Sequence, residues 1–149
     1  MATRTDPLTL EVVELIGDVV TRYYEEYDEA AAVHSLTGAQ ARVLGLLSIE
    51  AMPMRRLAGR LKCEPSNVTG IVDRLEARGL AERRPDPADR RVKLAAATEA
   101  GRRTSRELRA SMDFAREPLG ELSAGERTVL RDLLKRMLGR PPGPVAQER

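Results

Sequence analysis

The sequence predicts a mainly α-helical protein with a small β-wing, a winged helix-turn-helix whose N- and C-terminal helices form a dimerisation region. Two observations predict this class. Within residues 54–101, two short helical patterns are joined by a tight turn and followed by a basic hairpin. On both sides of that segment stand helical patterns with one apolar face. The central order of helix, turn, helix and hairpin is that of a winged helix-turn-helix.

The two central helices each have one face to bury. The first repeats apolar residues at helical spacing, at Leu57, Ala58 and Leu61. The second has an apolar stripe at i, i+3, i+4 and i+7, made of Val68, Ile71, Val72 and Leu75. Pro65 suits the first position of a helix, where its missing N–H is no loss. Gly79 suits the left-handed residue that ends one, so the second helix should run from about Pro65 to Arg78.

The polar face of this second helix is the expected nucleic-acid surface. The residues opposite the apolar stripe or on its flank are Ser66, Asn67, Thr69, Gly70, Asp73 and Arg74. Asparagine offers a paired donor and acceptor to adenine, arginine reaches guanine or phosphate, and hydroxyls serve either role. A polar helix face can also be merely solvated. The basic hairpin beside it is what favours DNA.

That hairpin is expected to have strands at residues 80–84 and 91–97. In the second strand, Val92, Leu94 and Ala96 should face inward, alternating with the outward residues Arg91, Lys93 and Ala95. The hairpin carries five cations, Arg83, Arg84, Arg90, Arg91 and Lys93. This is more positive charge than so small a ribbon needs for solubility. A phosphate-lined partner is the simplest reason for it.

Charge is strongly divided along the chain, although the net value is only +2. Residues 55–93 hold 11 Lys and Arg against 6 Asp and Glu, whereas residues 1–54 hold 3 against 9. Residues 94–149 hold 11 against 8. A basic module beside an acidic one implies that only part of the surface meets nucleic acid.

Three segments closely resemble the multiple-antibiotic-resistance regulator (MarR) family: residues 66–80, residues 82–91, and the run Thr98-Glu99-Ala100-Gly101. The resemblance implies a homodimer that binds double-stranded DNA at a pseudo-palindromic operator. The recognition helix would enter the major groove and the wing the minor groove. It also implies a repressor that releases DNA when a small, frequently phenolic or otherwise anionic, effector binds.

The exposed helix face and the basic wing predict separate roles within the DNA site. Ser66, Asn67 and Thr69 should contact bases or phosphates in the major groove, and the cations expected to meet mainly the DNA backbone are Arg74, Arg83, Arg84 and Lys93. Where the family commonly has arginine, this chain has Gly70, which removes an expected DNA contact and weakens the helix by about 1 kcal/mol relative to alanine. Gly70 would instead allow a close approach to the DNA backbone.

The wing tip carries the spacing Asp89-x-Arg91, which resembles the family's minor-groove element. A guanidinium at the tip of a hairpin fits a narrow, electronegative minor groove. We expect Arg91 to insert, Asp89 to hold it extended, and Arg90 to meet a flanking phosphate or to pair with Asp89 instead. The alternative is a solvated charged turn, since surface ion pairs are common.

The flanking helices supply the dimer scaffold that the resemblance implies. We expect one domain over residues 1–149, divided into dimerisation helices at 8–36 and 118–139, the winged helix-turn-helix at 37–98, a connecting helix at 99–117 and a flexible tail at 140–149. The first helix has an apolar stripe too large for a small domain to cover alone, made of Val12, Leu15, Ile16, Val19, Tyr23 and Tyr27. Thr37 and Ser123 each open a capping box, and Thr98 can cap the connecting helix.

Effector pockets in relatives lie between the dimerisation helices and the DNA-binding lobe. Residues of suitable chemistry near that junction are Tyr23, Tyr27, His34, Arg42, Met52 and Met54. The alternative for the tyrosines is that they pack at the dimer interface with their hydroxyls at its wet edge. Both interpretations stay open from the sequence.

No motif predicts catalysis, a metal site or a cofactor. The chain has a single histidine, no phosphate-cradling loop and no nucleophile motif, so we expect no enzyme activity. It has no apolar run of membrane-spanning length and no signal-peptide core, which predicts a cytoplasmic protein that makes no membrane contact.

Two other functions remain open. Cys63 stands just before a helix N-terminus, where a thiolate is favoured, so a thiol-based redox sensor is the alternative to a plain turn role. Peroxide sensors of the family carry their reactive cysteine near the start of the first helix, where this chain has none. A winged helix can also be a protein-interaction adaptor, which should leave the wing and recognition face less basic than they are here.

Overall fold

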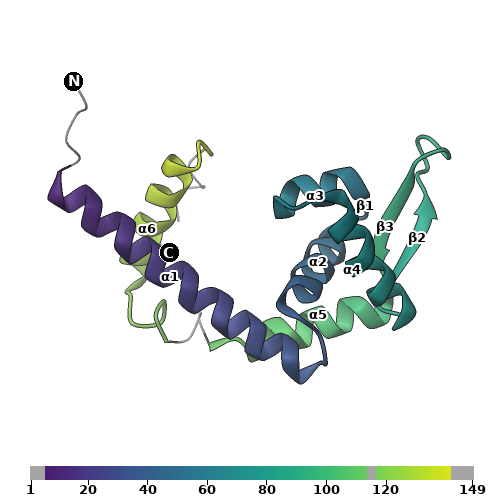
Figure 1. Cartoon of the computed structure of the whole chain (residues 1–149). Coiled ribbons are helices and arrows are strands. Elements are labelled where there is room, and N and C mark those ends of the chain that lie inside the picture. The colour runs from purple at the N-terminus through teal and green to yellow at the C-terminus, as the bar shows by residue number, and fades with distance from the viewer. Residues whose placement is uncertain (1–5, 114–116, 142–149) are drawn as a thin grey trace, which may run out of the picture. The chain divides into compact units, whose positions relative to one another are not determined.

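A computed structural model describes residues 6–113 and 117–141 (Figure 1). Its contacts divide the chain into two compact units, residues 1–112 and 113–149, where we expected one domain. The first unit holds the helices α1 (Pro7–Val33), α2 (Gly38–Ile49), α3 (Met54–Leu61), α4 (Pro65–Ala77) and α5 (Glu99–Ser111), and the strands β1 (Met52–Pro53), β2 (Ala81–Pro85) and β3 (Lys93–Ala97). The second unit holds α6 (Ala124–Met137). Most of the predicted tail, residues 142–149, lies outside the described residues.

The first helix is long and mostly exposed. Asp6 caps it by accepting a hydrogen bond from the Thr9 backbone N–H at 3.0 Å. The buried side chains of its 27 residues are Tyr27, Ala30 and Ala31. Its exposed apolar side chains include Leu8, Val12, Leu15, Ile16, Val19 and Tyr23. The predicted stripe is therefore uncovered in the described part of the chain, except for Tyr27, which packs into the core instead.

Local capping interactions start three of the helices where the sequence predicted. Thr37 and Gln40 form the capping box of α2, and Ser123 and Glu126 form that of α6. Thr98 caps α5, because its Oγ1 accepts a hydrogen bond from the Gly101 N–H at 3.1 Å. Each cap satisfies a backbone donor that a helix end leaves unpaired.

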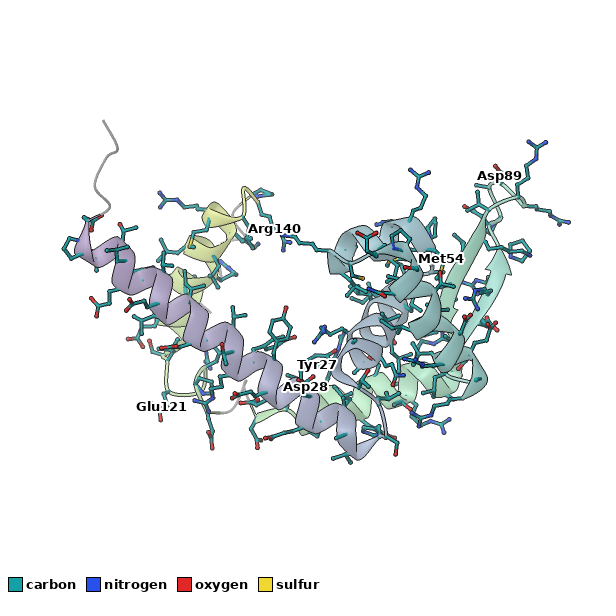
Figure 2. All side chains as sticks on the ribbon, in the orientation of Figure 1. Tyr27, Asp28, Met54, Asp89, Glu121 and Arg140 are labelled. Atoms are coloured by element: carbon teal, nitrogen blue, oxygen red, sulfur yellow. The ribbon has the colours of Figure 1, made fainter. Side chains whose placement is uncertain are left out.

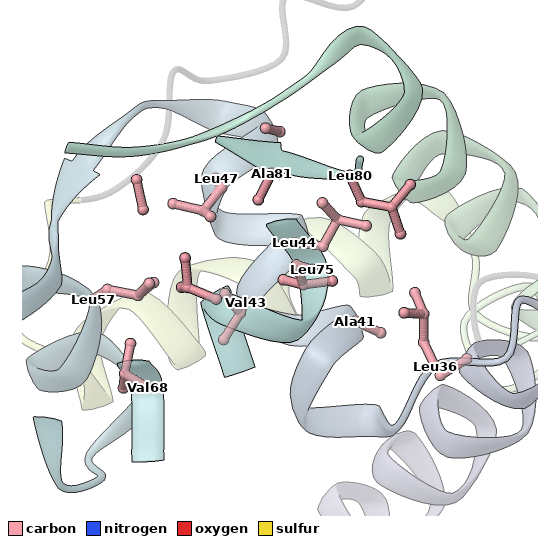
Figure 3. Packing of buried hydrophobic residues seen from close by; sticks show 14 of the residues in the cluster. Leu36, Ala41, Val43, Leu44, Leu47, Leu57, Val68, Leu75, Leu80 and Ala81 are labelled. Atoms are coloured by element: carbon pink, nitrogen blue, oxygen red, sulfur yellow. The ribbon is translucent and has the colours of Figure 1, made fainter. Parts of the chain in front are cut away.

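The core of the first unit surrounds α2. Figure 3 shows Val43, Leu44 and Leu47 of this helix packed among side chains from α3, α4 and the sheet. The predicted apolar faces are confirmed, with the buried members Leu57, Ala58, Val68, Val72 and Leu75. Burying each large aliphatic side chain contributes roughly 1.5–3 kcal/mol, so this packing fixes how α4 is turned. The polar face of α4 is left outside this core.

A three-stranded antiparallel sheet joins the helices, in the order β1-β3-β2. The hairpin of β2 and β3 projects away from the helices (Figure 1). β1 pairs with β3 through Met52 opposite Ala95, and it was not predicted from the sequence. A strand of two residues shows no alternation that a pattern search can detect. The predicted hairpin strands were otherwise correct to within one or two residues at each end.

The predicted facing of β3 was wrong for Ala95, whereas Lys93 is exposed and Leu94 and Ala96 are buried as expected. Ala95, which we expected to face outward, is fully buried, and Ala95 and Ala97 belong to the helical core. Leu94 and Ala96 are also buried but lie outside that cluster. β3 is the middle strand, and three consecutive alanines show no polar and apolar alternation that could fix the register. The sequence of β3 therefore contains no signal that predicts which of its side chains face the core.

The connecting helix is shorter than predicted. α5 ends at Ser111 because Met112 adopts an extended backbone conformation, with φ −77° and ψ 125°. Residues 114–116 of the predicted span 99–117 lie outside the described residues. Among the helices that are described, none combines the length and apolar character needed to cross a membrane.

Candidate nucleic-acid interface

The exposed face of α4 is the centre of the candidate interface. With its apolar stripe buried, α4 leaves Ser66, Asn67, Thr69 and Arg74 exposed. Gly70 is half-buried, and a Cβ atom added to it would meet no atom within 4 Å. The absence of a side chain at Gly70 therefore leaves open space on the polar face of the helix.

The Thr69 hydroxyl is already engaged within the helix. Its Oγ1 donates a hydrogen bond to the Pro65 carbonyl oxygen at 3.0 Å. Because a hydroxyl has a single hydrogen, Thr69 then offers a partner its oxygen lone pair and its methyl group. These suit the amino group of adenine or cytosine, or the methyl group of thymine.

A hollow of about 480 Å³ lies beside this face, between α4, the end of α3 and the start of α2. Its walls include Arg42 and Arg74, together with the polar side chains of Ser66 and Asn67. Neither arginine forms an ion pair with any residue that the structure describes. Two guanidiniums without carboxylate partners make this hollow attractive to an anion such as a phosphate.

The wing tip is folded by backbone hydrogen bonds and by two aspartates. Asp86 Oδ1 accepts from the Ala88 N–H at 2.9 Å, and Asp89 Oδ1 accepts from the Arg91 N–H at 3.0 Å. Figure 2 shows Asp89 at the far end of the hairpin. Asp89 thus fixes the backbone of Arg91, whereas we expected it to hold the guanidinium. Across the described ranges, Arg90 and Arg91 form no ion pair.

The cations of the hairpin differ in how far they are available. Arg84 is exposed, with its Nη1 3.9 Å from Glu82 Oε1, and Lys93 is exposed as the first residue of β3. Arg83 is instead held by α4: its Nη2 lies 2.6 Å from Asp73 Oδ1, and its Nη1 donates to Glu76 Oε2. We expected Arg83 to meet the DNA backbone and did not expect this pairing.

The charge of Arg83 is stabilised by these contacts. Burial lowers its pKa, but the hydrogen bonds and charges of Asp73 and then Glu76 outweigh burial and raise the pKa above its ordinary value. The contacts with Asp73 and Glu76 therefore favour the charged form of the guanidinium. No sequence signal could have identified the pairing, because the three residues lie on a helix and a strand whose relative placement comes from the fold.

A second interaction that the sequence did not reveal involves Arg78, the residue after α4. Its guanidinium donates to the backbone carbonyl oxygens of His34 and Ser35, at the end of α1. These contacts join two helices whose ends are separated by more than 40 positions in the chain. A carbonyl has no residue-specific signature in a sequence, so this contact was invisible there.

Comparisons with known proteins agree with the winged-helix geometry. Residues 34–92 match the model of the MarR family. The transcriptional repressor NicR of Pseudomonas putida is 30% identical over 142 residues, which cover 89% of this chain and 88% of NicR. The chain belongs to the MarR family. It is a transcriptional regulator of the winged-helix, DNA-binding type, and the family and relatives that it matches are regulators and not enzymes.

Solved structures of MarR proteins support the same assignment. A mutant MarR of Escherichia coli complexed with operator DNA is 26% identical, with a TM-score of 0.70 and coverage of 90% of this chain and 99% of that one. CouR of Rhodococcus jostii RHA1, bound to p-coumaroyl-CoA, is 27% identical, with a TM-score of 0.68 and coverage of 99% and 100%. Both likenesses extend over most of the chain.

The residues of this MarR protein that we predicted for an effector site fall into separate environments. Tyr23 lies 5.7 Å from Tyr24 and from Tyr27, measured between ring centroids. Tyr27 is buried, and its hydroxyl donates to the Ala41 carbonyl oxygen at 3.4 Å. Arg42 lies over the Tyr24 ring, 5.0 Å from its centroid. The sequence analysis did not select Tyr24 as an effector residue.

The other three predicted effector residues are less exposed to a ligand. Met52 is 1% exposed and belongs to the core, and Met54 begins α3, half-buried against that core. His34 is the C-cap of α1 and is half-buried. Figure 2 shows Tyr27 and Met54 on different elements, α1 and α3. Among the predicted six, Arg42 lines the hollow beside α4.

Cys63 is half-buried in the turn between α3 and α4, packed against the core. The turn itself is made by Lys62, which adopts a left-handed conformation with φ 51°. No group of residues suited to holding a metal ion occurs in the portion of this MarR protein that the structure describes.

Proposed function

We propose that this protein is a repressor that binds a pseudo-palindromic operator as a homodimer and is released by a small phenolic or anionic effector. The observation that carries the proposal is the exposed face of α4. Asn67 and Ser66 are exposed there, and Arg74 is exposed two turns further along the helix, with no ion-pair partner among the described residues. An exposed amide and an available guanidinium on one helix face are the chemistry of major-groove recognition.

The wing supports the same proposal. Arg90, Arg91 and Lys93 are exposed at or near its tip. Unpaired cations on a projecting hairpin suit the minor groove and its flanking phosphates. A protein-interaction adaptor is expected to have a less basic wing than this one.

A salt titration of DNA binding tests the proposed DNA contact. The account predicts that the protein binds random duplex DNA with an affinity that falls steeply as salt increases, with a slope of about −0.9 for each phosphate contact. An adaptor would show no binding or a negligible slope. NicR is named as a repressor, and one MarR structure contains operator DNA, which are the precedents for the direction of regulation.

The apolar stripes of the terminal helices support a homodimer. On α1 the exposed members include Leu15, at 55% exposure, and Val19, at 53%. On α6 the exposed members are Val129, Leu133, Leu134 and Met137. Apolar surface on this scale is rare on monomeric proteins and marks an interaction face. Sedimentation at micromolar concentration should show a dimer, and a stable monomer would contradict this part of the proposal.

For the effector, we propose Arg42 as the residue that meets an anionic group, with Tyr24 under its guanidinium and Tyr23 next to that ring. Arg42 lacks a carboxylate partner in the described ranges and already contacts an aromatic ring. CouR, which is bound to p-coumaroyl-CoA, is the precedent for the ligand class. The probe is p-coumarate, a phenolic anion. It should weaken operator binding by wild type but not by Arg42→Ala, and an equal response of both would remove Arg42 from the site.

A further inference from the structure

We propose that Arg83 is a positioning residue that fastens the base of the wing to the recognition helix, with Asp73 and Glu76 as its partners. This inference rests on the proposed DNA-binding function and deepens it. It also replaces the earlier expectation that Arg83 contacts the DNA backbone.

The recognition helix α4 carries two acidic side chains. Asp73 and Glu76 lie three positions apart, so they occupy neighbouring sites on one side of the helix. Two carboxylates on a helix that approaches a polyanion would repel its phosphates. The negative charge of these two residues must therefore be compensated, and the structure shows the cation that does so.

Both carboxylates converge on one side chain of β2. Arg83 Nη2 lies 2.6 Å from Asp73 Oδ1, Nη1 donates to Glu76 Oε2, and the Arg83 backbone N–H donates to Glu76 Oε1 at 3.3 Å. The planar fork of arginine can serve two acceptors at once, whereas a lysine ammonium lacks that geometry. Three hydrogen bonds therefore connect the recognition helix to the first strand of the wing.

The same contacts make the Arg83 guanidinium unavailable to a DNA phosphate. Its side chain is 26% exposed, against 54% for the neighbouring Arg84. If Arg83 turned to DNA, Asp73 and Glu76 would lose their partner beside a phosphate backbone. While Arg83 stays paired, it compensates the charge of both carboxylates, and Arg84 remains available to DNA.

The position of Arg83 in the hairpin determines how its contacts with α4 affect the wing tip. Arg83 pairs with Ala95, two residues from the last pair of the ladder, Pro85 and Lys93, and the tip with Arg91 lies beyond it. The rise along a strand is about 3.3 Å per residue, so a small rotation at Arg83 moves the tip by much more. Surface ion pairs contribute little to the stability of the fold. Loss of the Arg83 contacts should therefore change the position and mobility of the wing more than the free energy of unfolding.

The test compares operator affinities of designed variants with that of the wild type. The double variant Asp73→Asn, Glu76→Gln removes two negative charges from the DNA-facing side, so electrostatics alone predicts tighter binding. The proposal predicts the opposite, a loss of about 10-fold. Adding Arg83→Ala to this double variant should change affinity by less than about 2-fold, because its partners are already gone.

Neighbouring residues supply matched controls. Glu82→Gln removes an exposed acid from the same strand and should leave affinity equal or slightly tighter. Arg84→Ala should reduce the salt slope by about 1, as expected for a phosphate contact. Arg83→Lys keeps the charge but cannot bridge both acids, so it should bind as weakly as the double variant.

A measurement on the free protein separates this inference from the proposed function. The Asp86 N–H donates to the Val92 carbonyl oxygen at 2.9 Å within the wing. The double variant should exchange this amide hydrogen faster, while amides of α2 exchange as in wild type. Each of three results would overturn the proposal. They are unchanged exchange of the Asp86 amide in the double variant, operator binding by the double variant that equals or exceeds that of the wild type, and a further loss of affinity of about 10-fold when Arg83→Ala is added. Absence of DNA binding by the wild type would instead refute the proposed function and leave the exchange result to decide this one.

Discussion

The guanidinium of Arg78 holds the end of α1, with its Nη1 donating to the Ser35 carbonyl oxygen at 2.8 Å. Its Nη2 donates to the carbonyl oxygen of His34 at 2.9 Å. Ser35 itself adopts a left-handed conformation, with φ 55°. One side chain therefore satisfies two carbonyls at the end of a helix and links that end to the C-cap of the recognition helix.

Replacing this residue should have a measurable effect on stability. Arg78→Ala should lower the free energy of unfolding by about 1 kcal/mol, since two charged hydrogen bonds are lost at an exposed site. Urea unfolding followed by circular dichroism measures the change. The matched control is Arg103→Ala, another exposed arginine, which should stay within about 0.5 kcal/mol of wild type. Equal stability of both variants would show that the Arg78 contacts contribute nothing.

Asn67 and Arg74 should differ in what they recognise. Asn67→Ala should change the order of preference among operator variants, with about 1–3 kcal/mol lost at one base pair. Arg74→Ala should weaken all duplexes alike and reduce the salt slope by about 1. Anisotropy titrations on a panel of single-base operator variants measure both. If the relative affinities stay the same in Asn67→Ala, then Asn67 does not read a base.

At the wing tip, Arg91→Ala and Asp89→Ala should both weaken operator binding. Removing the guanidinium should cause the larger loss, while Asp89→Ala releases the Arg91 backbone N–H and leaves the cation present but less well held. Melting temperatures should change little, because the tip is exposed. Equal operator affinities for wild type and Arg91→Ala across a range of salt would show that the tip does not enter the groove.

The phenol of Tyr27 should make stability depend on alkaline pH. Burial raises its pKa above the ordinary value of 10.0, with Tyr23 adding to the rise and Arg109 and Arg42 opposing it. The pKa of Tyr27 is higher in the folded protein than in the unfolded chain. The contribution of the neutral phenol to the free energy of unfolding is therefore complete below pH 10 and is lost as the pH rises through the folded pKa. Tyr27→Phe should remove that alkaline loss, as measured by urea unfolding at neutral and alkaline pH. A wild type and variant that lose stability in parallel would contradict it.

The parts of the fold that follow from local chemistry were predictable from the sequence. The caps at Thr37, Thr98 and Ser123 and the apolar stripe of α4 depend on residues within one turn or one helix. The strand β1 is too short to show a pattern, and the alanines of β3 carry no contrast between faces. The long-range contacts of Arg78 and Arg83 arise because packing brings distant elements together.

The candidate site divides in the same way. Exposure of Asn67, Ser66 and Thr69 follows from the helical period, since the stripe on the other side is buried. The partition of the wing arginines does not follow from it, because Arg83 and Arg84 are neighbours with the same chemistry. Only the position of the carboxylates on α4 distinguishes the arginine that is held from the one that is available.

The most direct test of the account is the number of protomers bound to one selected operator. Duplexes selected by the protein from a random pool should contain an inverted repeat with half-sites about 10 bp apart, one helical turn. Analytical ultracentrifugation should find two protomers on each such duplex, with affinity at least about 10³-fold tighter than for a scrambled duplex of the same composition. One protomer bound per repeat, or equal affinity for the repeat and the scrambled duplex, would contradict the account.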